Sequence, residues 1–139
     1  MYYLKTSACF DSAHFLHGYN GKCANIHGHH WLVEVKILSD KLHECGENRG
    51  MILDFSDFKQ AVKELAASFD HTLIYEKNTL KPKTIAALKE EGFSLLETDF
   101  RPTAENFAAH IYAELSGKGL PISCVSVYES PENCAMYGE

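Results

Sequence analysis

The segment HHWLVEVKIL, residues 29–38, alternates its side-chain character along its centre. A side-chain period of two is typical of a β-strand whose faces meet different surroundings. The segment therefore predicts a strand with two unlike faces: Val33, Val35 and Ile37 on one, and Leu32, Glu34 and Lys36 on the other.

A second strand is predicted on the N-terminal side of the first. Residues 2–15 mix β-branched, aromatic and small side chains, which favours a strand. Side chains two apart leave a strand on the same face, so Phe10, Ser12 and His14 share one face. The residues between the strands, 16–26, contain two glycines and predict a loop.

Two later stretches have apolar residues at helical spacing. The first helix is predicted to begin after Ser56 as N-cap, and the second after Thr103 as N-cap. Glycine ends the second pattern, PTAENFAAHIYAELSGKG. The apolar positions are Phe58, Val62, Leu65, Ala66 and Phe69 in the first helix, and Phe107, Ile111 and Leu115 in the second.

The residues between the two helices, 72–102, form a long connection. It contains a short helical pattern, TIAALKEE, and a short strand pattern, FSLLE; two further strands are predicted in PISCVSVYES and CAMYG. The order strand, strand, helix, helix, strand, strand favours an α+β fold with an antiparallel sheet covered on one face. Because apolar residues occur on both sides of the strands, we expect oligomerisation to bury the other face.

Length and composition limit the possible classes of protein. A chain of 139 residues predicts a single domain, 1–139. The net charge is −6 and the basic residues are dispersed, which argues against a nucleic-acid partner. No apolar run approaches the ~20 residues of a membrane-spanning helix, and the N-terminus lacks a signal-peptide pattern, so a cytoplasmic protein is expected. The 5 cysteines form no C-x-x-C pair and predict free thiols.

The run CANIHGHH, residues 23–30, concentrates potential metal ligands. His27 and His29 are two apart at the start of a strand, so their imidazoles leave the same face and can converge on one ion. His14, on the neighbouring strand, can supply a third ligand, and three imidazoles suit zinc. A thiolate from Cys23 as fourth ligand makes a closed, structural site, whereas a site without it keeps an open catalytic position. The other histidines are predicted to lie outside the site: His17, His30, His43 and His110.

Motifs in order along nearly the whole chain resemble those of the 6-pyruvoyltetrahydropterin synthase and 6-carboxytetrahydropterin synthase family. CANIHGHH resembles C-x3-H-G-H, and FDSAHFL is similar to F-x-x-A-H-x-L. GMILDFSDFK resembles G-x-h-h-D-F-x-x-h-K, where h is apolar. FDHTLI is similar to L-D-H-x-x-L, with Phe69 in place of the usual leucine. PTAEN resembles P-T-x-E-N, and VSVYES resembles V-x-V-x-E-T.

The resemblance implies a T-fold, in which tandem strand-strand-helix-helix units form an antiparallel four-stranded sheet with two helices on one face. Oligomerisation into trimers or hexamers completes the barrel, and active sites lie between subunits. Compared with the family, this chain has an insertion around 76–101, between the two main helices. We interpret the insertion as an oligomer contact and an inert surface excursion.

The resemblance also implies roles for individual residues. Three match zinc ligands: His14, His27 and His29. Three match catalytic residues: Cys23, a general base, and Asp70 with His71, a pair that supports proton transfer and comes from another subunit. Three match substrate-binding residues: Glu129, which holds the pterin 2-amino group and ring N3, and Thr103 and Glu105 beside the pterin.

The implied activity is a zinc-dependent lyase reaction on 7,8-dihydroneopterin triphosphate. The short spacing between Cys23 and His27 resembles that of the 6-carboxytetrahydropterin synthases, which release acetaldehyde and triphosphate on the route to queuosine and other deazapurines. A 6-pyruvoyltetrahydropterin synthase, whose spacing is longer, is an alternative. A non-catalytic, zinc-stabilised pterin-binding module is a second alternative. Lys22 is a candidate contact of the triphosphate on its charge.

Overall fold

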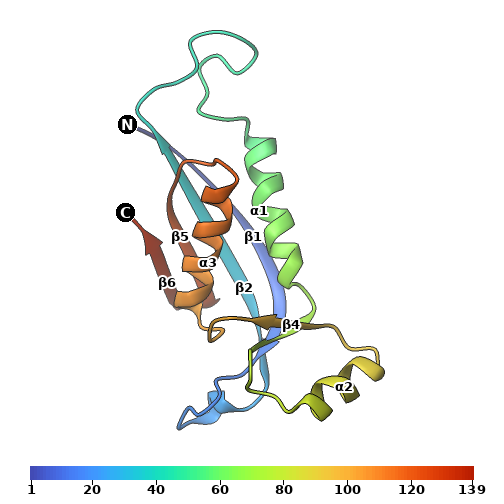
Figure 1. Cartoon of the computed structure of the whole chain (residues 1–139). Helices are drawn as coiled ribbons and strands as arrows, with labels where there is room; N and C mark the ends of the chain where they lie inside the picture. Colours follow the sequence, from blue (N-terminus) through green and yellow to red (C-terminus); the bar gives the residue numbers. More distant parts are fainter.

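The computed structural model describes residues 1–139 and is built on one curled six-stranded sheet (Figure 1). The strands lie in the order β4-β3-β1-β2-β5-β6. The antiparallel part consists of β1 (Tyr2–His14), β2 (His27–Ser39), β5 (Ile122–Ser130) and β6 (Asn133–Gly138). Beyond β1, the parallel strands β3 (Thr72–Glu76) and β4 (Leu95–Thr98) continue the sheet. The α+β class predicted from the sequence is confirmed, with a mixed sheet.

The two long N-terminal strands, β1 and β2, form an antiparallel pair that positions the histidines. Their register runs from Tyr2 opposite Ser39 to His14 opposite His27. β2 begins at His27, slightly before the strand that alternation alone predicts. Trp31 is fully buried and His30 is exposed, as expected for side chains that alternate between the two faces.

Two helices cover one face of this sheet: α1 (Phe55–Phe69) packs on β1, and α3 (Ala104–Gly117) packs on β5 (Figure 1). The predicted inward positions of both helices are buried, except Leu65, which is half-buried. On the sheet side, every second residue of β2 is buried against them: Trp31, Val33, Val35 and Ile37. None of the helices is long and apolar enough to cross a membrane.

The connection between α1 and α3 contributes two strands to the sheet and is therefore more than a surface excursion, while its role as an oligomer contact stays a prediction. It contains β3, α2 (Pro82–Glu90) and β4. The prediction of a four-stranded antiparallel sheet is wrong, because β3 pairs in parallel with both β1 and β4. The TLIYE strand has adjacent buried residues, Ile74 and Tyr75, and therefore lacks the alternation by which the other strands were recognised.

The N-caps of the two long helices differ in how well the sequence predicts them. Thr103 caps α3, because its Oγ1 accepts a hydrogen bond from the Asn106 backbone N–H at 3.3 Å. The prediction of Ser56 as the cap of α1 is wrong. The Asp54 carboxylate accepts a hydrogen bond from the Ser56 N–H at 2.6 Å, so Asp54 is the cap and the helix begins at Phe55.

The face of the sheet away from α1 and α3 carries polar pairs, which weakens one reason for expecting oligomerisation. On this face Lys5 Nζ lies 2.7 Å from Glu34 Oε2 across β1 and β2. The hydrogen bond from Lys5 holds the pKa of Glu34 below its usual range. The outer strands β4 and β6 each have one edge without a partner strand. Oligomerisation therefore stays a prediction that rests on these edges.

We expect Phe107→Ala to lower the free energy of unfolding by about 3–5 kcal/mol. Phe107 is fully buried, and removal of its ring leaves a cavity among four aromatic neighbours: Phe10, Trp31, Phe69 and Phe100. Urea unfolding at a fixed protein concentration measures the loss. Phe93→Ala is the control, because Phe93 is 62% exposed and its truncation should change stability by no more than about 0.5 kcal/mol. Equal losses in the two variants would contradict this description of the core.

Candidate functional site

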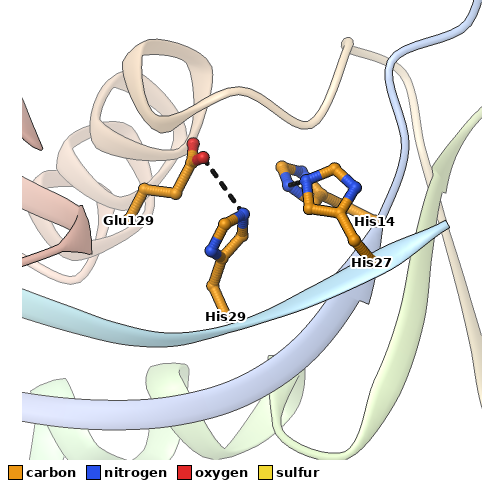
Figure 2. A group of neighbouring side chains, drawn as sticks. All are labelled: His14, His27, His29 and Glu129. Carbon is orange, nitrogen blue, oxygen red and sulfur yellow. Dashed lines mark hydrogen bonds and ion pairs between the residues drawn. The ribbon is translucent and has the colours of Figure 1, made fainter. Parts of the chain in front are cut away.

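Three histidines and one glutamate gather on the sheet (Figure 2). His14 ends β1, His27 and His29 lie at the start of β2, and Glu129 lies near the end of β5. One potential ligand atom from each residue lies within 4.8 Å of those of the others. The pairing of β1, β2 and β5 thus brings together side chains from distant parts of the sequence. We call these residues the four-donor group.

Backbone carbonyls orient two of the imidazoles. His14 Nδ1 lies 2.7 Å from the Pro102 carbonyl oxygen, and His27 Nδ1 lies 2.7 Å from the Asn25 carbonyl oxygen. Because a carbonyl oxygen only accepts hydrogen bonds, each Nδ1 carries a proton, and each Nε2 of the neutral ring presents a lone pair. The two Nε2 atoms lie 3.1 Å apart. Two nitrogens bound to one tetrahedral zinc at 2.0–2.1 Å are about 3.3 Å apart, so this spacing suits metal ligands.

The third imidazole has a buried nitrogen that lacks a partner. His29 Nε2 makes no hydrogen bond. Glu129 Oε1 lies 3.0 Å from it, which is within ion-pair distance, but the two groups are not aligned for a hydrogen bond. Three converging imidazole nitrogens and a carboxylate form a donor set that can bind a metal ion, and its chemistry fits zinc.

Burial favours the neutral form of His14 and His29, which is the form that binds a metal. His14 is 1% exposed, and burial lowers its pKa although the hydrogen bond to Pro102 opposes the shift. Burial also lowers the pKa of His29, against the opposing charge of Glu129. The Trp31 ring lies between these histidines and the core, with ring centroids 5.1 Å from His14 and 5.3 Å from His29.

Cys23 lies outside the four-donor group. It sits in a single 3-10 turn, Lys22–Ala24, in the loop between β1 and β2. Its carbonyl oxygen accepts a hydrogen bond from the Leu16 N–H at 2.9 Å, and its half-buried thiol is free. The fourth donor near the histidines is Glu129, so the arrangement favours the alternative in which Cys23 is not a metal ligand.

Asp70 and His71 form a separate, exposed pair between α1 and β3. Asp70 Oδ2 lies 2.8 Å from His71 Nδ1, and Asp70 Oδ1 accepts a hydrogen bond from the Asp11 N–H at 2.8 Å. The Asp11 N–H and then His71 lower the pKa of Asp70, and the Asp70 carboxylate raises the pKa of His71. With Nδ1 held by the carboxylate, Nε2 of His71 is free to exchange a proton. A role in the site of another subunit stays a prediction.

We expect the imidazole of His71 to titrate above its ordinary pKa of 6.5 because Asp70 stabilises the protonated ring. A raised folded-state pKa means that this contribution to stability is present below pH 6.5 and is lost as the pH rises through the folded-state value. NMR titration of the ring protons measures the midpoint. Asp70→Asn should return the midpoint toward 6.5, and an unchanged midpoint in that variant would contradict the assigned cause.

Thr103 and Glu105 lie at the N-terminus of α3, where Thr103 is the cap and Glu105 is exposed in the first turn. Sequence reasoning missed the contribution of their neighbour Pro102, whose carbonyl orients His14. It also missed the equivalent contribution of the Asn25 carbonyl to His27. A backbone carbonyl is present at every residue, so no residue type signals these contacts.

Comparison with known proteins gives concordant results. The family model described as 6-pyruvoyl tetrahydropterin synthase matches residues 3–139. The chain is 34% identical over 142 residues to a Haemophilus influenzae protein named 6-carboxy-5,6,7,8-tetrahydropterin synthase, with both chains covered in full. It is 36% identical over 129 residues to an Archaeoglobus fulgidus protein named as a putative enzyme of the same kind, which covers 93% of this chain and 89% of the relative.

Solved structures show the same fold at low sequence identity. A Wolinella succinogenes protein superposes with a TM-score of 0.78 at 18% identity, over 99% of this chain and 98% of that one. The Caenorhabditis elegans 6-pyruvoyl tetrahydropterin synthase superposes with a TM-score of 0.65 at 22% identity, over 99% of this chain and 95% of that one.

Proposed function

Because the chain belongs to the 6-pyruvoyl tetrahydropterin synthase family, we propose that it is a zinc-dependent 6-carboxy-5,6,7,8-tetrahydropterin synthase. The substrate is 7,8-dihydroneopterin triphosphate, and the products are 6-carboxytetrahydropterin, acetaldehyde and triphosphate, on the route to queuosine and other deazapurines. The observation that carries this proposal is the full-length similarity to the Haemophilus influenzae protein of that name.

In this proposal His14, His27 and His29 hold the zinc, and the carbonyls of Pro102 and Asn25 keep two of the rings in the required orientation. When bound, zinc acidifies the hydroxyl groups of the substrate side chain and polarises a carbonyl. The donor set supports this role through its three imidazole nitrogens.

The remaining chemistry belongs to the protein's own side chains. Cys23 is the general base that removes a proton from the substrate side chain. His71, held at Nδ1 by Asp70, moves a proton at Nε2 and is contributed to the site of a neighbouring subunit. Thr103 and Glu105 lie beside the pterin. The protein acts as a homo-oligomer, a trimer or a hexamer, with sites between subunits.

Glu129 provides a test, because its proximity to His29 allows two roles. As the pterin anchor, its carboxylate accepts hydrogen bonds from the ring; as a fourth ligand, it holds the metal. We propose the anchor role and expect Glu129→Ala to raise KM by about tenfold or more, the effect of an unpaired ring donor, while the zinc content is unchanged. Steady-state kinetics and metal analysis measure both. Loss of zinc with the glutamate would assign it as a ligand instead.

A product assay tests the proposed function directly. Zinc-loaded protein is incubated with 7,8-dihydroneopterin triphosphate, and the pterin is identified by mass alongside an assay for acetaldehyde. A 6-carboxy product with acetaldehyde supports the proposal. A 6-pyruvoyl product keeps the site residues and replaces the activity, and no turnover by a zinc-loaded oligomer points to the non-catalytic binding module.

A further inference from the structure

Asp11, the second residue of the FDSAHFL motif, contacts both members of the Asp70–His71 pair. Its backbone N–H donates to Asp70 Oδ1 at 2.8 Å. Its backbone carbonyl accepts a hydrogen bond from the His71 N–H at 2.7 Å. The main chain of Asp11 therefore binds the side chain of Asp70 and the backbone of His71.

The side chain of Asp11 is held in turn by His30. Asp11 lies directly opposite His30 in the register of β1 and β2, and its Oδ1 lies 2.7 Å from His30 Nδ1. The N–H and carbonyl of Asp11 bind Asp70 and His71, so they form no backbone hydrogen bonds to His30 on β2. Asp11 and His30 are therefore a non-hydrogen-bonded pair of the antiparallel strands. Side chains approach more closely at such non-hydrogen-bonded positions, which favours a direct contact.

His71 needs such support because its backbone is strained. Its φ angle is +55°, in the left-handed region that residues other than glycine seldom adopt. Strained residues persist where their surroundings hold them. The pairing of β1 with β3 begins only at the next positions, Ser12 with Thr72, so the Asp11 carbonyl is the contact that attaches His71 to the sheet.

These residues also face a common space. Asp11, His30 and His71 line a cavity of about 680 Å³ together with apolar residues of the insertion, among them Leu88 and Phe93. Proton transfer between His71 and a molecule bound in this cavity would depend on the position of the His71 ring.

We propose that Asp11 is a positioning residue for the Asp70–His71 pair and that His30 anchors Asp11 from β2. The inference rests on the proposed function, in which the pair moves a proton. It also gives His30, predicted from the sequence to lie outside the metal site, a defined role beside the strand segment that carries His27 and His29.

The effect of the Asp11–His30 contact on global stability distinguishes a positioning role from general stabilisation of the fold. The side chains of Asp11 and His30 are 58% and 68% exposed, so their contact contributes little to global stability. Its loss should loosen the Asp70–His71 pair without unfolding the sheet, because local opening and global unfolding are separate events.

Amide hydrogen exchange of the full-length protein tests this without substrate. In Asp11→Ala and in His30→Ala, protection of the His71 amide should fall by about fivefold, while protection of the core Val33 amide is retained. His30→Asn should keep the protection, because its side-chain amide can donate the same hydrogen bond. Glu34→Ala, which removes the other cross-strand ion pair of the same face, is the matched control and should leave the His71 amide unchanged.

Two exchange results would overturn the proposal: unchanged protection of the His71 amide in both alanine variants, or an equal loss at Val33. Kinetics add a second readout. His30→Ala should lower kcat by about tenfold with KM changed less than about twofold, and His30→Asn should restore kcat. A rise in KM alone would contradict a positioning role. A wild-type protein without turnover contradicts the proposed function, and the exchange result then decides the positioning by itself.

Discussion

Replacement of His27 with alanine should weaken zinc binding by more than about 100-fold. The loss of a residue that only supports a metal ligand costs 10–100-fold, and His27 contributes a ligand atom itself. Its Nε2 lies 3.1 Å from that of His14, and its Nδ1 is held by the Asn25 carbonyl, so the ring is already oriented for coordination. Titration against a zinc chelator of known affinity, with metal analysis of the purified protein, measures the change.

His43→Ala is the matched control for this experiment. His43 is exposed in the loop between β2 and α1, and its side chain does not belong to the four-donor group. The control should bind zinc with unchanged affinity. If His27→Ala retained the affinity of the unaltered protein, the assignment of the four-donor group as a zinc site would be wrong.

Replacement of Cys23 with alanine should lower kcat by about 100- to 10,000-fold, the range expected for loss of a general base. The zinc content should be unchanged, because the three histidines hold the zinc in the proposed site and Cys23 lies outside the four-donor group. The assay of pterin product and acetaldehyde measures the rate, and metal analysis of the same sample measures the zinc.

Cys45→Ala controls for the loss of a thiol, since Cys45 is free and exposed in the loop after β2. It should retain full activity. The two ways in which Cys23→Ala can fail have different meanings. Retained activity would remove Cys23 from the catalytic residues, whereas loss of zinc would make it a ligand and support the closed, structural site.

Local periodicity explains why much of the fold could be predicted. In β2 the buried residues Trp31, Val33, Val35 and Ile37 recur at every second position, so the alternation marks both the strand and its inner face. Thr103 marks the start of α3 because its side chain caps the helix within a few residues of itself. Such signals are read from neighbours in the sequence.

The connection between α1 and α3 shows where this reasoning stopped. Ile74 and Tyr75 of β3 are adjacent and both buried, so the strand has no alternation to detect. Its parallel partner β1 lies far from it in the sequence, and its other partner β4 is separated from it by α2. No local sequence pattern therefore specifies these pairings. The N-cap of α1 was predicted wrongly because Asp54 and Ser56, two positions apart, are both favourable N-cap residues.

The sequence by itself determined that His27 and His29 share a face and that His30 faces away, because side-chain direction follows from the strand period. The tertiary structure decided which further groups join them. Sheet pairing brings Glu129 from β5 to His29, the start of α3 places the Pro102 carbonyl on His14, and β1 carries the backbone of Asp11 to Asp70 and His71. These contacts depend on the order of distant strands and on backbone atoms that every residue has, so they leave no signature in residue type.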